Sequence, residues 1–131
     1  MQKQLELFSN NLPAKTRCCD DFDVDNKVRL LKNAIKKRYI QPNDFNSTQW
    51  LVFDIDRPVC PDSLRNDYLV PEPTLFVSNP SNGHAHLFYL LKTAVHKNAH
   101  SSQKAIQFTA AIEFGLATKL GADMGYVGLL A

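Results

Sequence analysis

The stretch "WLVFDID", residues 50–56, restricts the possible fold more than any other part of the chain. An apolar run of this kind predicts a strand in a buried sheet. Side chains alternate across a strand. One face should therefore carry Trp50, Val52, Asp54 and Asp56, and the other Leu51, Phe53 and Ile55. A buried sheet gains nothing from two carboxylates about 6.6 Å apart along one strand, so Asp54 and Asp56 are candidate functional residues.

Two carboxylates this close repel each other unless a cation lies between them or one is protonated. Mg²⁺ and Mn²⁺ prefer carboxylate oxygen and often complete their shells with substrate phosphates, so a divalent metal site is one interpretation. The other is a structural strand end, at which both acids reach solvent or pair with Arg57 or Arg65. The two aspartates alone leave both interpretations open.

Two further motifs carry residues with possible chemistry. In "NGHAHLFYLL", residues 82–91, His84 and His86 would share one face of a strand beside a flexible turn. Two imidazoles placed in this way can bind a metal or a phosphate, although half-exposed structural histidines are the alternative. In "GADMGY", Asp123 follows an apolar residue just beyond a predicted helix, where turn aspartates are also common.

The patterns after residue 60 predict an alternation of strands and helices. Strands are expected over 74–78 and 84–91, joined by the turn "NPSNG" at 79–83. Residues 62–73 indicate a loop with one helical turn. A helix should begin at Ser101 or Ser102 and run to about Leu120, where Gly121 ends it. Its expected core stripe is Ala105, Phe108, Ile112 and Leu116, and "ADMGYVGLL" would begin a further strand.

The first third of the chain is less patterned. Residues 1–24 suggest an extended lead-in, and Asp25–Tyr39 suggests a helix with the apolar stripe Val28, Leu31 and Ile35. This helix should pack on the sheet face opposite the two aspartates. Its basic end, Lys36, Lys37 and Arg38, either complements the helix dipole or faces phosphates. Strand pairs with two helices covering one face predict an α+β fold.

Composition limits the class of protein. A chain of 131 residues fits one domain, and a net charge of +2 excludes a strongly basic nucleic-acid binder. No apolar stretch approaches the roughly 20 residues that span a membrane. The odd set Cys18, Cys19 and Cys60 is no disulfide framework, so a cytoplasmic location is expected. The final "GYVGLLA" stops within an apolar run, and we therefore expect a piece of a longer protein.

The order of the motifs resembles the archaeo-eukaryotic primase superfamily. "WLVFDID", "HAH" and "AD", with Asp123, are similar to its hhhDhD, sxH and hD motifs in that order. A closer likeness is carried by "KKRYIQPN", "LVFDIDRP", "SNPSNGHAHLFYLL" and "GADMGYVGLL". Together these segments resemble the plasmid replicase family, the replication initiators of colicin-type plasmids, from about Leu12 onward. Residues 1–11 would be a lead-in and residues 12–131 a partial primase-type catalytic domain.

This resemblance implies a palm-like, RRM-like sheet, mostly antiparallel, and a specific activity. Such proteins make a short RNA primer at the plasmid origin from nucleoside triphosphates, and the host DNA polymerase extends it. Asp54, Asp56 and Asp123 would hold two divalent ions, Mg²⁺ or Mn²⁺. His86 would bind the incoming triphosphate, with His84 as an assisting residue. The cluster Lys36, Lys37 and Arg38 would lie near template or phosphate, with Lys37 and Arg38 as nucleotide-binding candidates.

Two other functions remain open from the sequence. Rolling-circle initiators carry a His-hydrophobic-His strand that holds one metal and a helix-borne tyrosine that cuts DNA. The predicted helix over 101–120 contains no tyrosine, while Tyr89 lies on the histidine strand and Tyr126 beyond the helix. The third class is a non-catalytic DNA-binding module, which predicts a dominant basic surface.

Overall fold

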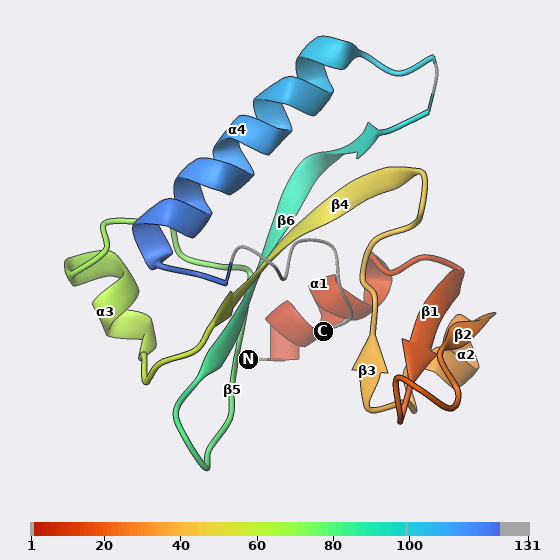
Figure 1. Ribbon diagram of the computed structural model, residues 1–131, viewed down its shortest axis with the longest axis horizontal. Coiled ribbons are helices and arrows are strands. Elements are labelled where there is room, and N and C mark those ends of the chain that lie inside the picture. Colours follow the sequence, from red (N-terminus) through yellow and green to blue (C-terminus); the bar gives the residue numbers. More distant parts are fainter. Residues whose placement is uncertain (1, 99, 124–131) are drawn as a thin grey trace.

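The computed structural model describes residues 2–98 and 100–123. It is an α+β fold in which two antiparallel three-stranded sheets are flanked by helices (Figure 1). The elements are, in chain order, α1 (Gln2–Asn10), β1 (Lys15–Cys19), β2 (Lys27–Leu30), α2 (Leu31–Ala34), β3 (Tyr39–Ile40), β4 (Ser47–Ile55), α3 (Pro61–Asn66), β5 (Leu75–Ser78), β6 (Ala85–His96) and α4 (Gln103–Leu120). The α+β class predicted from the sequence is therefore confirmed.

The large sheet has the strand order β4–β6–β5. The predicted strands over 50–56, 74–78 and 84–91 correspond to β4, β5 and β6, and β6 continues further, to His96. A tight turn joins β5 to β6, and Gly83 in it has φ +76°. A Cβ at this glycine would also lie 3.3 Å from Pro58, so a side chain there would be strained by the backbone and crowded by Pro58.

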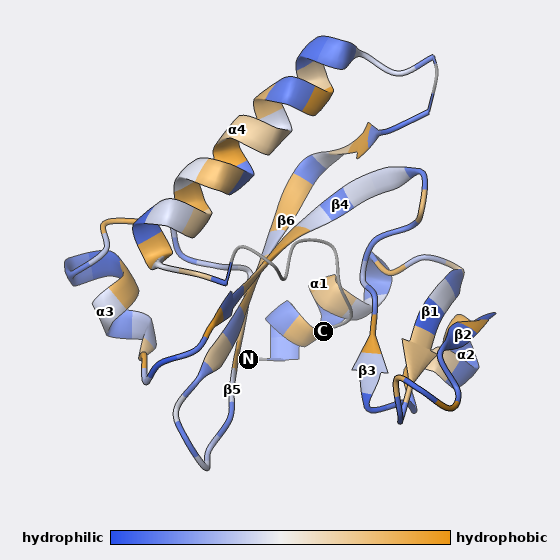
Figure 2. Cartoon of the chain, viewed as in Figure 1, coloured by the Kyte–Doolittle hydropathy of each residue, from blue (hydrophilic) through white to orange (hydrophobic). Residues whose placement is uncertain are grey.

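Side chains on β4 alternate between two cores, as the sequence predicts. On one face, Leu51, Phe53 and Ile55 join a core with Leu64 of α3 and Leu120 of α4. On the other face, Trp50 packs with residues of β5 and β6 and with Phe8 of α1. Figure 1 accordingly shows α3 and α4 on one side of the large sheet and α1 with the small sheet on the other. The centres of β4 and β6 are strongly hydrophobic (Figure 2).

The predicted extended lead-in over residues 1–24 is wrong, because this segment contains α1 and β1. The ring of Phe8 meets those of Trp50 and Phe88 edge to face, with centroids 5.3 and 5.4 Å apart. The indole Nε1 of Trp50 donates to the carbonyl oxygen of Asn11 at 3.0 Å. The ring contacts of Phe8 and this hydrogen bond thus attach the N-terminal segment to the sheet. The mostly polar sequence of residues 1–11 did not predict these contacts.

The predicted helix over Asp25–Tyr39 is also wrong. Residues 27–30 form β2, which pairs with β1 in the small sheet of order β2–β1–β3, and α2 spans only residues 31–34. Val28 and Ile35 are 49% and 58% exposed, so no helical stripe is buried against the large sheet. Lys-Val-Arg-Leu alternates polar and apolar residues, which is compatible with a strand, and residues 27–30 pair with β1 although Val28 and Leu30 are about half exposed.

Helix α4 begins and ends as predicted. The Ser102 hydroxyl accepts the Ala105 amide, and Gly121 follows the helix with φ 62°. Of the predicted core stripe, Leu116 packs on the core, but Ala105 is exposed, Phe108 is 69% exposed and Ile112 is 39% exposed, so most of the stripe is wrong. The face turned inward is instead made of buried and half-buried residues shifted along the helix: Ile106, Thr109, Glu113, Leu116, Ala117 and Leu120. Hydrophobic residues recur along the whole of α4, so hydropathy alone did not identify the contact face (Figure 2).

The loop over 62–73 contains its expected helical turn as part of α3. The further strand expected after Gly121 falls mostly on residues 124–131, which lie outside the described part of the chain. Among the described helices, none combines the length and apolar character needed to cross a bilayer.

Candidate functional site

The site is built around Asp54, at the end of β4. In the antiparallel register of β4 and β6, Asp54 lies directly opposite His86. The imidazole Nε2 of His86 is 3.1 Å from Asp54 Oδ1. Asp54 and His86 therefore lie on adjacent strands and face the same side. This placement follows from the period of two in both motifs combined with antiparallel pairing.

Asp56 and Asp123 join Asp54 from two different segments. Asp56 is exposed just after β4, and Asp123 lies just after α4. The amide of Asp123 donates to the carbonyl oxygen of Asp54 at 2.9 Å, which attaches the segment after α4 to the end of β4. One carboxylate oxygen from each of the three aspartates lies within 4.8 Å of the others. The aspartate pair of β4 and the aspartate that follows α4 thus form one cluster.

Burial of Asp54 makes ionisation of its carboxyl group unfavourable. Loss of solvent around Asp54 raises the pKa of its carboxyl above the ordinary value, and the neighbouring Asp56 and Asp123 raise it further, while His86 lowers it. The side chain of Asp54 is only 17% exposed. A cation bound by the three carboxylates would relieve both the repulsion and the desolvation.

Arg57 holds the two halves of the site together. Its Nη1 donates to the carbonyl oxygen of Gly121 at 3.2 Å, and its Nη2 donates to that of Leu120. Its Nε donates to the Tyr68 hydroxyl at 3.0 Å, and the guanidinium lies over the Tyr68 ring. Arg57 therefore satisfies carbonyls at the C-terminus of α4, where the helix dipole favours a cation.

This role of Arg57 has no sequence pattern. The sequence suggests Arg57 only as an ion-pair partner for the aspartates, whereas its three hydrogen-bonding nitrogens contact two carbonyls and a phenol. The sequence offers only two features that relate to this role: Arg57 directly follows "DID", and Gly121 shortly precedes Asp123. A Cβ at Gly121 would lie 3.1 Å from Arg57 Nη1, which shows how closely the two segments approach.

We expect Arg57→Ala to loosen the attachment of Asp123 without unfolding the protein. Hydrogen bonds that involve a charged group contribute about 1.5–3 kcal/mol, so hydrogen exchange at the Asp123 amide should accelerate about tenfold or more. Arg57→Lys should restore part of the protection. Arg65→Ala, which removes an exposed arginine from α3, is the matched control. Unchanged exchange at Asp123 in Arg57→Ala would contradict this role.

His84 has a different position from the one predicted. It lies in the turn just before β6, where its carbonyl oxygen accepts the amide of Asn79 at 2.8 Å and its own amide donates to the Asn82 side chain at 2.9 Å. Within residues 2–98 and 100–123, no hydrogen bond or ion pair links its imidazole to the acids. The structure brings His86, and not His84, into contact with Asp54.

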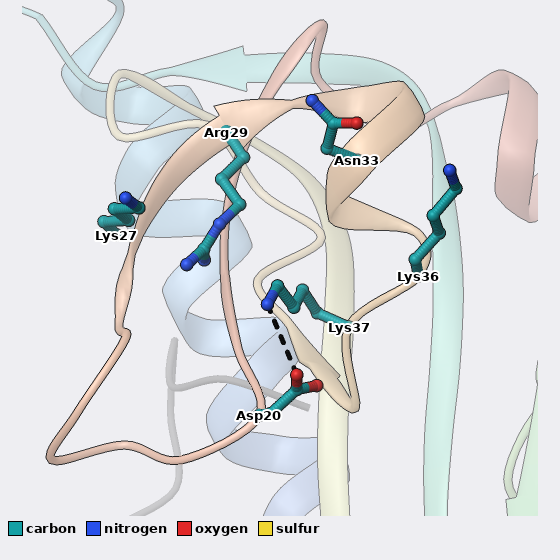
Figure 3. Close-up of a pocket in the computed structure, with 6 residues that line it drawn as sticks. All are labelled: Asp20, Lys27, Arg29, Asn33, Lys36 and Lys37. Carbon is teal, nitrogen blue, oxygen red and sulfur yellow. Dashed lines mark hydrogen bonds and ion pairs between the residues drawn. The ribbon is translucent and has the colours of Figure 1, made fainter.

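The basic residues near position 37 belong to a separate pocket on the small sheet. This pocket has a volume of about 490 Å³ and is lined by Asp20, Lys27, Arg29, Asn33, Lys36 and Lys37 (Figure 3). Lys37 Nζ is 3.3 Å from a carboxylate oxygen of Asp20 and 3.2 Å from one of Asp25. Arg38 lies over the Tyr39 ring. None of Asp54, Asp56 and Asp123 lines this pocket. Lys37 pairs with Asp20 and Asp25, and Arg38 lies over Tyr39, so the structure does not bring these two residues to the cluster around Asp54.

Comparison with known protein families gives a match over most of the chain. The sequence model of a family described as "Replicase family" matches residues 11–131. Searches of curated proteins and of solved structures gave no match. The matched range includes all three aspartates of the cluster, His86 and Arg57.

Proposed function

Since this chain belongs to the Replicase family, whose name indicates a role in replication, we propose that it is a plasmid replication initiator with primase activity. It would bind origin DNA as template and join nucleoside triphosphates into a short RNA primer. The host DNA polymerase would then extend this primer. The family assignment supports replication, and the chemistry of the site supports nucleotidyl transfer.

The observation that carries the proposal is the cluster of Asp54, Asp56 and Asp123 beside His86. Nucleotidyl transfer needs carboxylates gathered at one point, because the reacting triphosphate and the pyrophosphate that leaves are strongly negative and require divalent counter-ions. The strand order β4–β6–β5, with a helix after β4 and another after β6, is compatible with a palm-like sheet. Such a sheet would present the cluster at the ends of its strands.

The donor set fits Mg²⁺ or Mn²⁺. All three candidate ligands are carboxylates, which hard divalent cations prefer, and their oxygens lie within 4.8 Å of one another. Two such ions would supply charge neutralisation for the triphosphate and activate the attacking hydroxyl. In this proposal Asp54, Asp56 and Asp123 are the ligands. A half-buried Asp54 with a raised pKa is the acid that gains most from a cation.

His86 would serve the same site in two ways. Its Nε2 contact fixes the orientation of the Asp54 carboxylate. Its side chain is 33% exposed, so part of the ring remains reachable for a phosphate oxygen beside the acids. Binding of the incoming triphosphate by His86 is therefore part of the proposal. His84 has a weaker claim, since it lies in the turn.

The endonuclease alternative needs a tyrosine nucleophile near the histidines. Tyr89 is three positions from His86 and faces the other side of β6, where it packs on the core with Phe53. Its hydroxyl donates to the carbonyl oxygen of Pro71 at 2.7 Å, and burial raises its pKa to about 12. Such a phenol is a poor nucleophile at neutral pH. Tyr126 lies outside the described residues.

The test is the product formed from a supercoiled plasmid that carries the cognate origin. With ribonucleoside triphosphates, one of them labelled, and Mg²⁺ or Mn²⁺, we expect a short labelled RNA that a DNA polymerase can extend. A plasmid without the origin is the control. Nicked plasmid with covalently attached protein would establish the endonuclease alternative instead. Origin binding with neither product would favour the non-catalytic module.

A further inference from the structure

A groove of about 990 Å³ lies between the small sheet, β4 and α4. One wall is formed by β1 and β2, with Lys15, Arg17 and Val28. The second is the N-terminal half of α4. The loop before β4, with Asn43 and Phe45, closes one end. The groove and the pocket in Figure 3 lie on opposite faces of the small sheet. Lys15 and Arg17 of β1 face the groove, so Thr16 and Cys18 face the other side. Their partners on β2 are Arg29 and Lys27, which line the pocket.

The groove extends along β4 as far as Val52, and none of the three clustered aspartates lines it. Its lining includes Trp50 and Val52 of β4, which share a face of the strand with Asp54. Consecutive residues on one face of a strand are about 6.6 Å apart, so Val52 is one such step from Asp54. A ligand in the groove would therefore lie one step along β4 from the carboxylates.

The α4 wall of the groove is partly polar. Thr109 and Glu113 are half-buried and face inward, at positions where a helix packed on a closed core would carry apolar residues. Burial raises the pKa of the Glu113 carboxyl, while nearby Lys97 lowers it. On α4, polar residues thus face the groove, while Phe108 and Phe114 are exposed. Thr109 and Glu113 therefore offer polar groups to a ligand in the groove.

Cations and one aromatic ring mark the chemistry of that ligand. Lys15 and Arg17 are exposed and make no ion pair with any residue that the structure describes. Lys97 also lines the groove, as do the acids Asp44 and Glu113. Phe45 is 91% exposed, which is an unfavourable position for an aromatic side chain with no ligand. Exposed cations beside a solvent-facing ring are the combination that binds single-stranded nucleic acid, through phosphate contacts and base stacking.

We propose that this groove binds the single-stranded template, with Lys15 and Arg17 on its phosphates and Phe45 stacked on a base, and leads it along β4 towards Asp54. The assignment of the strand as template rests on the proposed primase function. The binding of single-stranded nucleic acid in the groove stands on the geometry alone.

The experiment measures binding of a labelled 12-nucleotide DNA of mixed sequence by fluorescence anisotropy, without nucleotides or divalent ions. The double variant Lys15→Gln/Arg17→Gln should bind about tenfold more weakly at moderate salt. Its salt slope should fall by about 1.4, which is about 0.7 for each phosphate that the variant no longer neutralises. Phe45→Ala should weaken binding about tenfold with the salt slope unchanged, and Phe45→Tyr should bind as the wild type does. All these side chains are exposed, so the variants should fold normally.

Two matched controls make the result specific to the groove. Lys27→Gln/Lys36→Gln removes the same charge from the other face of the small sheet, and Phe114→Ala removes an exposed ring from the outer side of α4. Both should bind within about twofold of the wild type. If the control double variant weakens binding as much as Lys15→Gln/Arg17→Gln does, the groove is not the site. Tighter binding of a duplex of the same length would also overturn the proposal.

The groove and the primase activity can fail separately. Asp54→Asn leaves the groove intact and should bind the oligonucleotide as the wild type does. Groove-dependent binding in a protein that makes no primer would overturn the primase activity and keep the groove. Primer synthesis that is unchanged in Lys15→Gln/Arg17→Gln, together with unchanged binding, would overturn the groove and keep the activity.

Discussion

Asp54→Asn is expected to lower primer synthesis by about a hundredfold or more while leaving the protein folded. The amide oxygen can still act as a ligand, but one negative charge is lost from the group formed with Asp56 and Asp123. In the proposed function these carboxylates would hold the divalent ions that supply the counter-charge of the triphosphate, and loss of the charge would weaken their binding. The measurement is incorporation of labelled nucleotide on origin plasmid, with Mg²⁺ and with Mn²⁺.

The same substitution should stabilise the metal-free protein at neutral pH. The pKa of Asp54 is raised in the folded state, so folding favours the protonated form, and the wild type loses stability as the pH rises through that raised pKa. Asp54→Asn does not lose stability in this way. The difference in the free energy of unfolding between the variant and the wild type should therefore increase from acid to neutral pH. Urea unfolding in the presence of a chelator measures this difference.

Asp62→Asn is the matched control, because Asp62 is an exposed acid on α3 outside the cluster. It should change neither primer synthesis nor stability. Primer synthesis by Asp54→Asn at near the wild-type rate would show that these carboxylates are structural. Origin binding should remain near the wild-type level in Asp54→Asn, and its loss together with a lower stability would contradict the prediction that the variant stays folded.

Trp50→Ala should have the largest effect on stability, lowering the free energy of unfolding by about 3–5 kcal/mol. The Trp50 side chain is completely buried, and its ring meets Phe8 of α1 and Phe88 of β6. Truncation would leave a cavity between the large sheet and α1, and the hydrogen bond from Nε1 to Asn11 would be lost. Urea unfolding followed by circular dichroism measures the change.

Trp50→Phe separates the two contributions. It keeps an aromatic ring in the core and loses the hydrogen bond, so it should cost about 1–2 kcal/mol, a fraction of the alanine effect. Phe45→Ala, at an exposed ring only a few positions away, should leave the unfolding free energy unchanged. A cost below about 1 kcal/mol for Trp50→Ala would mean that α1 does not depend on this contact.

Much of the candidate site could be predicted because it depends on local periodicity. Asp54 and His86 each sit in a strand whose apolar neighbours define its two faces, so their orientation follows from counting residues. Asp123 could be placed only as a residue that follows a helix. What brings it to Asp54 is the backbone hydrogen bond at 2.9 Å and the hydrogen bonds of Arg57 to the end of α4, and neither has a sequence pattern.

The wrong helix over Asp25–Tyr39 and the wrong stripe on α4 have different physical causes. Val28, Leu31 and Ile35 have helical spacing, yet residues 27–30 found a partner in β1, and pairing between strands outweighed weak helical propensity. The stripe expected on α4 failed because apolar residues recur on several sides of that helix, and only packing chose the face that contains Ala117 and Leu120. The small sheet and α1 could not be predicted because their buried residues are few and scattered.

The sequence by itself determined the β4–β6 pair, its two faces, the limits of α4 and the residues that carry the acids, because alternation, capping and turn chemistry act over a few neighbouring residues. Only the tertiary structure decided that Arg57 joins β4 to α4, that Lys37 is held by Asp20 and Asp25, and that Lys15, Arg17 and Phe45 line one groove beside β4. Those contacts link segments far apart in the chain, and their formation depends on how the elements pack, which no local pattern encodes.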